Sequence, residues 1–212
     1  GGEIENFYHY LTTVGGGKLL RVFWFFFVFE FFRVVVVDLL ALIFIKINRY
    51  LNRNKRADAR RRLRVENPLV SILVPGKNEG KHIFKLVTSL KEQTYQNFEL
   101  IVVDDGSDDD TEIIGKSLKN KGLIDFFVRN DVRGGKASGA NTALRLAKGK
   151  YIVHLDADCS YDRDAIENIL IPFFEDEKVG AVGGNVMVRN YTDSLATTLQ
   201  SIEYTDAISI GR

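Results

Sequence analysis

Short apolar runs alternate with helix-like patterns through the chain after residue 68. Between the runs, apolar residues recur at helical spacing, as they do at Ile83, Leu86 and Leu90. This rhythm predicts an α/β fold with a mostly parallel sheet and helices on both faces. The runs predicted as strands are Leu69–Val74, Phe98–Val103, Leu123–Val128, the run that begins at Tyr151, and Val179–Val188.

The segment 19–47 is apolar almost throughout and follows a polar lead over residues 1–18. A bilayer is crossed by about 20 apolar residues in a helix, so the segment is long enough for a transmembrane helix. Three charges lie in its interior, Glu30, Arg33 and Asp38, and Glu30 and Arg33 are spaced to pair on one helix face. We expect a single span, and the alternative is a buried amphipathic or core helix.

A strongly basic segment, residues 48–67, follows the expected span and is predicted to be a juxtamembrane linker. The positive-inside rule then places the N-terminus outside and the later domain in the cytosol, at a plasma or inner membrane. Basic clusters beside a membrane favour anionic lipid headgroups. No aromatic residue follows Tyr50 within the segment, which argues against nucleic acid. The single cysteine fits a reducing compartment.

Polar loops follow three of the predicted strands. Asp104-Asp105 can accept hydrogen bonds from a ribose or a base, and Gly134-Gly135-Lys136 offers a flexible backbone and a positive charge. Asp156 and Asp158 can reach one hard cation, because Mg²⁺ is commonly held by one or two carboxylates together with substrate phosphates. Ligands bind beyond the carboxyl ends of strands in open α/β sheets. The loops together predict a nucleoside-diphosphate site, and the alternative for the two aspartates is a solvated acidic turn.

The stretches VPGKNEG, VVDDGSDDDT, GGKASGAN and HLDADC, in this order, resemble the donor half of family 2 glycosyltransferases with a GT-A fold. The closest likeness is to membrane-embedded processive synthases of hyaluronan, cellulose, chitin oligosaccharide and poly-N-acetylglucosamine. The resemblance implies a GT-A, Rossmann-like donor-binding domain over residues 68–190. It also implies a glycosyltransferase that moves a sugar from a nucleotide sugar, most often a UDP-sugar, to a growing polysaccharide.

The resemblance adds a fourth loop, the one after the first predicted strand, and assigns it to the nucleotide together with the Asp104-Asp105 loop. Asp105 would contact the base, with Asp104 beside it. Asn78 and Glu79, in the loop that begins at Pro75, match the loop that closes over the uridine. These residues are therefore expected to bind the nucleotide sugar.

The other two loops are assigned to the diphosphate by the same resemblance. Lys136 matches a lysine near the donor phosphates, and Asn141 matches an asparagine in the helix behind it. Asp156 and Asp158 match the DxD acids, of which one or both would hold Mg²⁺ or Mn²⁺. Nearby, Cys159 is predicted to be a small buried residue and His154 a core histidine.

The family's general base lies in a TED-like motif and its acceptor site in a QxxRW motif, and neither is found in these 212 residues. The catalytic base is therefore unknown. Residues 191–212 resemble the start of the family's membrane-side region and are expected to form an interfacial helix. We expect the acceptor half to come from the remainder of a longer synthase or from a second polypeptide. Alternatives are sugar transfer to a polyprenyl or dolichyl phosphate lipid, and a nucleotide-sugar-binding fragment without catalysis.

Overall fold

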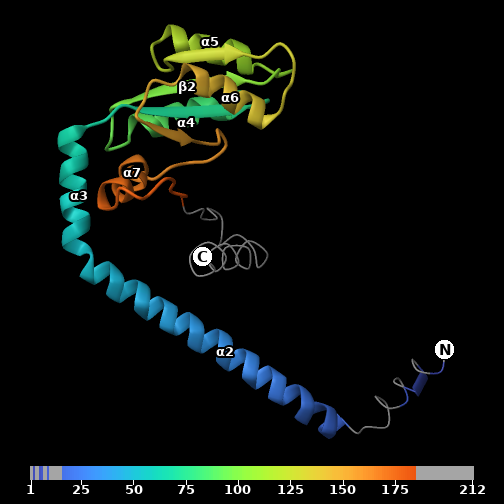
Figure 1. Cartoon of the computed structure of the whole chain (residues 1–212). Helices are drawn as coiled ribbons and strands as arrows, with labels where there is room; N and C mark the ends of the chain where they lie inside the picture. The colour runs from blue at the N-terminus through green and yellow to red at the C-terminus, as the bar shows by residue number, and fades with distance from the viewer. Residues whose placement is uncertain (1, 3–4, 7–8, 10–15, 185–212) are drawn as a thin grey trace. The chain divides into compact units, whose positions relative to one another are not determined.

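The computed structural model describes residue 2, residues 5–6, residue 9 and residues 16–184 (Figure 1). Residues 54–184 form one compact unit, and the helix over residues 16–51 belongs to another. The elements in chain order are α2 (Gly16–Leu51), α3 (Arg53–Glu66), β1 (Val70–Gly76), α4 (Gly80–Lys91), β2 (Phe98–Asp104), α5 (Thr111–Asn120), β3 (Phe126–Arg129), α6 (Lys136–Leu146), β4 (Tyr151–His154) and α7 (Ala165–Glu175).

The four strands form one parallel sheet in the order β3-β2-β1-β4. Gly76, Asp104 and Arg129 lie in register at the carboxyl ends of β1, β2 and β3. On the other side of β1, Leu73 is paired with His154, so the segment after β4 runs level with the end of β1. The predicted α/β fold with a parallel sheet is therefore confirmed, and its strand ends share one edge.

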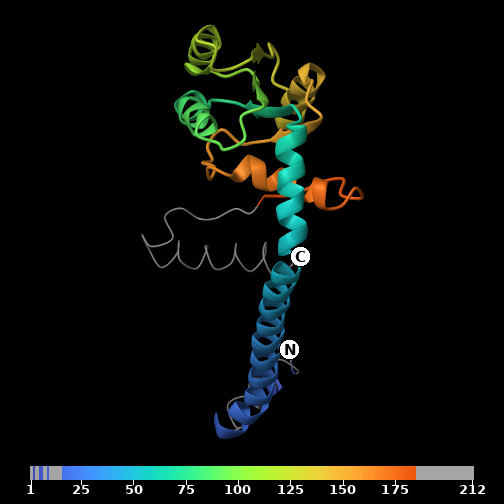
Figure 2. The ribbon, with the colours of Figure 1, turned by 90° about the vertical axis from the view of Figure 1, so that its left-hand side faces the viewer.

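Helices cover both faces of the sheet, as predicted. Helices α4 and α5 lie on one side and α6 on the other (Figure 2). The larger core joins α3, α4, α5 and α7 to the sheet and includes Ile72, Leu86 and Leu170. The smaller core lies under α6, where a Cβ on Gly139 would stand 2.9 Å from the Pro75 Cβ. The absence of a side chain at Gly139 therefore lets α6 lie close to the end of β1.

The basic segment is a helix of the domain, where the sequence predicted a linker. Ala59 and Leu63 of α3 are fully buried in the larger core. Arg64 Nε donates to Glu167 Oε1 of α7 at 2.8 Å, and Glu167 is itself only 4% exposed. One face of α3 is thus fixed by apolar burial and by an ion pair, while Arg61 on another face stays exposed.

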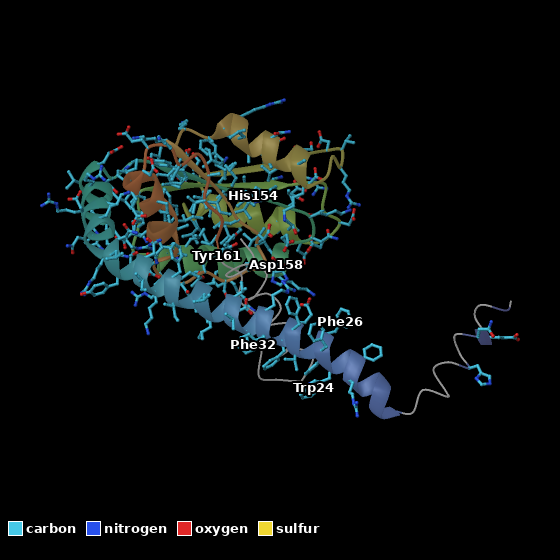
Figure 3. The ribbon with its side chains drawn as sticks, turned by 60° about the horizontal axis from the view of Figure 1, so that its bottom comes forward. Trp24, Phe26, Phe32, His154, Asp158 and Tyr161 are labelled. Carbon is cyan, nitrogen blue, oxygen red and sulfur yellow. The ribbon has the colours of Figure 1, made fainter. Side chains whose placement is uncertain are left out.

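Helix α2 is continuous over 36 residues and contains the predicted ion pair, with Arg33 Nη2 at 2.6 Å from Glu30 Oε2. Its aromatic side chains, among them Trp24 and Phe32, are exposed (Figure 3). Among the helices of residues 16–184, none is long and apolar enough to cross a membrane. The predicted span over 19–47 is not supported, because charged residues interrupt its apolar run. The orientation, with the N-terminus outside and the later domain in the cytosol, stays a prediction.

Two further expectations concern the end of the chain. Residues 179–184 do not form a strand, so the first part of the strand predicted over Val179–Val188 is wrong. The rest of that strand and the interfacial helix predicted over 191–212 lie outside the described residues.

Candidate functional site

A cleft of about 240 Å³ lies at the carboxyl edge of the sheet. Parallel strands bring their following loops to this edge, and the loops after β1, β2, β3 and β4 all contribute to the cleft. The residues that line it are Pro75, Gly76, Lys77, Glu79, Asp105, Arg133, Gly135, Lys136, Asp156, Ala157 and Asp158.

Asp105 fastens the glycine loop that follows β3. Its Oδ1 accepts from Asn130 Nδ2 at 3.0 Å and from the Gly134 N–H at 3.1 Å, and its Oδ2 accepts from the Gly135 N–H at 2.7 Å. Hydrogen bonds from Asn130 and the loop backbone lower the pKa of Asp105 against the opposing effect of burial. Gly135 has φ +81°, a conformation that glycine adopts without strain. The ionised carboxylate therefore shapes the loop that leads into Lys136.

Asp104 is fully buried and does not line the cleft. Its Oδ1 accepts from the Ser107 N–H at 2.9 Å and from the Ser107 hydroxyl, and its Oδ2 lies 3.3 Å from Arg129 Nη1. The carboxylate is thus satisfied by the turn after β2 and by the end of β3. The structure gives Asp104 a place in the framework under the site, although the sequence predicted a place against the nucleotide.

Asn78 joins two loops and is also absent from the lining of the cleft. Its backbone N–H donates to Ser107 Oγ at 2.8 Å, and its Oδ1 accepts from the Asp108 N–H at 3.0 Å. Asn78 has φ +61°, in the left-handed region that asparagine tolerates better than most residues. Next to it, Lys77 Nζ lies 2.8 Å from Asp108 Oδ2. These contacts fasten the loop after β1 to the loop after β2, and Lys77 is a cleft residue that the sequence did not assign.

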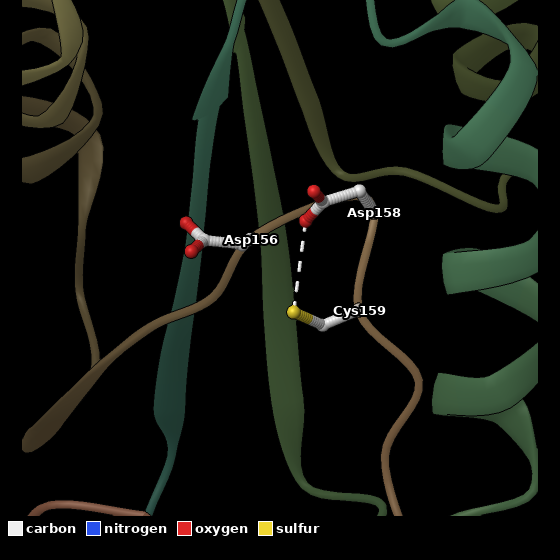
Figure 4. Close-up of side chains that lie close together, drawn as sticks. All are labelled: Asp156, Asp158 and Cys159. Carbon is white, nitrogen blue, oxygen red and sulfur yellow. Dashed lines mark hydrogen bonds between the residues drawn. The ribbon is translucent and has the colours of Figure 1, made fainter. Parts of the chain in front are cut away.

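Two acids and a thiol meet after β4 (Figure 4). The potential ligand atoms of Asp156, Asp158 and Cys159 all lie within 4.8 Å of one another. Cys159 Sγ is 3.6 Å from Asp158 Oδ1. Cys159 is exposed, so its predicted burial is wrong. Partial desolvation and the nearby Asp158 raise the pKa of the Cys159 thiol.

The donor set fits a hard divalent cation. Carboxylate oxygens suit the hard ions Mg²⁺ and Mn²⁺, whereas a soft sulfur ligand such as Cys159 does not. The ammonium group of Lys136 already contacts one of these carboxylates, because Lys136 Nζ is 2.5 Å from Asp156 Oδ1. The hydrogen bond to Asp156 raises the pKa of Lys136, so the side chain stays an ammonium. Asp156 and Asp158 could therefore hold a metal ion at the same place.

Tyr161 fixes the backbone of Asp156 and was missed in the sequence. The Asp156 N–H donates to the Tyr161 hydroxyl at 3.0 Å, and that hydroxyl donates to the Asp156 carbonyl at 2.9 Å. Burial raises the pKa of Tyr161, so it stays protonated and able to donate. The only hint in the sequence is an aromatic residue close after two acids, which has no specific meaning without the loop geometry.

The remaining predicted residues divide between the cleft and its surroundings. Glu79 lines the cleft, and burial followed by the negative charge of Asp158 raises its pKa. Arg133, which the sequence analysis did not single out, also lines it. Asn141 is exposed on α6 and is not among the lining residues. His154 is exposed rather than part of the core.

The cleft, lined by paired acids and by Gly135 and Lys136, lies at the carboxyl ends of parallel strands, where open α/β sheets bind their ligands. The profile of Glycosyl transferase family 2 matches residues 71–208. The chain therefore belongs to glycosyltransferase family 2, as the four motifs had indicated.

Two curated relatives are polysaccharide synthases. Over 141 residues the chain is 36% identical to a poly-beta-1,6-N-acetyl-D-glucosamine synthase of Staphylococcus epidermidis, covering 66% of this chain and 33% of that protein. A synthase of the same name from Staphylococcus aureus (strain COL) is 34% identical over 140 residues, with the same two coverages. The chain thus spans about a third of the length of the curated relatives it matches.

Among solved structures, a similar one is the mannosyltransferase PcManGT from Pyrobaculum calidifontis in complex with GDP-Man and Mn²⁺. The alignment covers 59% of this chain and 37% of that one, with 30% sequence identity and a TM-score of 0.49.

Proposed function

We propose that this chain is the donor-binding part of a glycosyltransferase that uses a UDP-sugar to extend a polysaccharide. The observation that carries the proposal is the meeting of Asp105, Lys136, Asp156 and Asp158 in one cleft at the carboxyl edge of the sheet. The names of the relatives make N-acetylglucosamine the sugar to test first.

The order of the strands suggests how a donor would lie in the cleft. Asp105 belongs to the β2 end, and Asp156 and Asp158 belong to the β4 end, with the β1 loop between them. We propose that the nucleoside lies near Asp105 and that the diphosphate lies near the two acids. Arg133 and Lys136 would supply positive charge, and Lys136 is also the first residue of α6, where the helix dipole favours an anion.

Asp156 and Asp158 would hold Mg²⁺ or Mn²⁺. When bound, such an ion stabilises negative charge on the departing diphosphate. Tyr161 would keep the Asp156 backbone in place for this role, because its hydroxyl bonds to both the N–H and the carbonyl of Asp156. Lys136 would add a second positive charge beside the leaving group.

Transfer also needs a base and an acceptor. An acceptor hydroxyl must lose a proton as it attacks the anomeric carbon, and a positioned carboxylate is the usual acceptor of that proton. We propose that this base and the acceptor site belong to the part of the enzyme corresponding to the remaining length of the relatives. A cytosolic donor domain stays a prediction, which fractionation of cells that produce the protein can test.

Calorimetric titration with UDP, with and without Mn²⁺, tests donor binding. We expect UDP to bind and Mn²⁺ to strengthen that binding. Changing both Asp156 and Asp158 to Ala should abolish the Mn²⁺ effect, while Asp162→Ala, an exposed acid in the same loop, should leave it unchanged. Binding of GDP in preference to UDP would refute the uridine assignment, and absence of binding to either would refute the donor site.

The product separates the two kinds of transfer. With the remainder of the enzyme present, we expect a polymer that grows from UDP-N-acetylglucosamine. A single sugar on a polyprenyl phosphate would show that the enzyme is a lipid-linked sugar transferase instead.

A further inference from the structure

Lys136 and the metal-ligand carboxylate Asp156 are already partners in this structure. Lys136 Nζ lies 2.5 Å from Asp156 Oδ1, and the two side chains are 60% and 46% exposed. Exposed ion pairs contribute about 0–1 kcal/mol to stability, so either side chain can readily exchange this contact for another partner. Asp156 thus has two competing cationic partners, the Lys136 ammonium and a divalent metal ion.

The same lysine also has two anionic partners within the proposed site. It lines the cleft together with Arg133 and the two acids, and a diphosphate placed there would compete with Asp156 for the ammonium. A doubly charged cation and an ammonium on one carboxylate repel each other, and only the ammonium has a long flexible stem on which to move away. Movement of Lys136 towards a phosphate would therefore free Asp156 for the metal.

The backbone around Lys136 is held so that a change of side-chain rotamer is enough. The N–H groups of Gly134 and Gly135 donate to Asp105, and the Gly139 N–H donates to the Gly135 carbonyl at 3.1 Å as α6 begins. The loop and the start of the helix can thus stay in place while the ammonium exchanges Asp156 for another anion.

We propose that Lys136 couples the two ligands of the site: its ammonium occupies the Asp156 carboxylate until a nucleoside diphosphate draws it away, so that nucleotide and metal ion bind cooperatively. The inference rests on the proposed function. Binding linkage is reciprocal, so UDP strengthens Mn²⁺ binding by the same factor by which Mn²⁺ strengthens UDP binding. Lys136 is a positioning residue in this role, because it acts on the metal through Asp156.

The test measures Mn²⁺ affinity by the electron paramagnetic resonance signal of free Mn²⁺, without UDP and with saturating UDP. In the protein without nucleotide, Lys136→Met should bind Mn²⁺ about two- to five-fold more tightly, the factor that corresponds to loss of an exposed ion pair. The factor by which UDP strengthens Mn²⁺ binding should shrink by a similar amount. Lys136→Gln is a second neutral variant, and both must melt as the wild type does.

Two control variants isolate the effect of the contact. Lys136→Arg keeps the positive charge and should keep most of the coupling. Lys150 lies just before β4, at the end of the strand opposite to Asp156. Its ammonium is 57% exposed and lies 2.5 Å from Glu66. Lys150→Met removes this ammonium and should change neither Mn²⁺ affinity nor coupling.

The outcomes distinguish this inference from the proposed function. Neutral variants with wild-type Mn²⁺ affinity and wild-type coupling would overturn the role of Lys136 while leaving the donor site intact. Weaker Mn²⁺ binding by both neutral variants in the absence of UDP would overturn it as well, since it would show that the ammonium does not compete. A wild-type protein that binds neither UDP nor Mn²⁺ would overturn the proposed function and this inference together.

Discussion

The replacement Asp105→Asn tests whether a single carboxylate holds the glycine loop in place. Asp105 is only 3% exposed and accepts three hydrogen bonds, from Asn130, Gly134 and Gly135. An asparagine has one acceptor oxygen where the aspartate has two. If that oxygen keeps the bonds from Asn130 and Gly134, the new amide group faces the Gly135 N–H, donor against donor.

The expected cost follows from that lost contact. A hydrogen bond to a charged group contributes about 1.5–3 kcal/mol, so we expect Asp105→Asn to lower the free energy of unfolding by about 2 kcal/mol at pH 7. For a domain of this size that corresponds to a melting temperature roughly 4–8 °C lower. Asp131→Asn, an exposed acid in the loop after β3, is the matched control and should change stability by less than about 0.5 kcal/mol.

The pH dependence provides a second, independent check. The pKa of Asp105 is lowered in the folded protein, so its ionised form stabilises the fold above the ordinary value of 3.8, and this stabilisation is lost as the pH falls through the lowered pKa. The difference in free energy of unfolding between wild type and variant, measured with urea, should therefore be largest at pH 7 and smaller near pH 3. Equal stability of the two proteins at pH 7, or a difference that does not change with pH, would refute the reasoning.

Two further replacements test other parts of the domain. Tyr161→Phe keeps the ring but removes the hydroxyl that bonds to the Asp156 backbone; we expect a loss of about 1–2 kcal/mol in urea unfolding and weaker Mn²⁺ binding, and unchanged Mn²⁺ affinity would exclude its positioning role. Leu63→Ala should lower the free energy of unfolding by about 2–5 kcal/mol, because Leu63 is fully buried on the inner face of α3. Val65→Ala, at a position 83% exposed, should cost almost nothing, and similar small effects of both would show that α3 does not stabilise the domain.

Strand and helix order could be predicted from the sequence because each element carries its own periodic signal. The strand β2 contains the uninterrupted apolar run 100–103, and α4 places Ile83 and Leu90 on one buried face. The predicted residues that line the cleft, such as Lys136 and Asp158, were found because loops after parallel strands must meet at one edge. Local pattern and sheet topology were sufficient for these features.

Features that depend on side-chain packing could not be predicted in the same way. The burial of Ala59 and Leu63 was not predicted, because α3 is strongly basic in composition. Their burial depends on α7, which lies more than a hundred residues later in the chain. The apolar composition of α2 likewise led to the prediction of a membrane span, although charged residues interrupt the apolar run. Asp104 and Asp105 are adjacent and identical in the sequence, yet only Asp105 faces the cleft, because successive side chains of an extended chain point in opposite directions.

Because of this alternation, the two adjacent acids at the end of β2 have different structural roles. Asp104 is turned inward and joins the β2 turn to the end of β3 through Arg129, while Asp105 is turned outward and holds the glycine loop. The position of Lys136 at the start of α6 thus depends on Asp105, and the proposed coupling of nucleotide and metal depends in turn on that position. A nucleotide base that contacts Asp105 would therefore act on the same loop from which Lys136 reaches Asp156. One short segment, residues 134–136, is thus bonded to Asp105 at one end of the cleft and to Asp156 at the other.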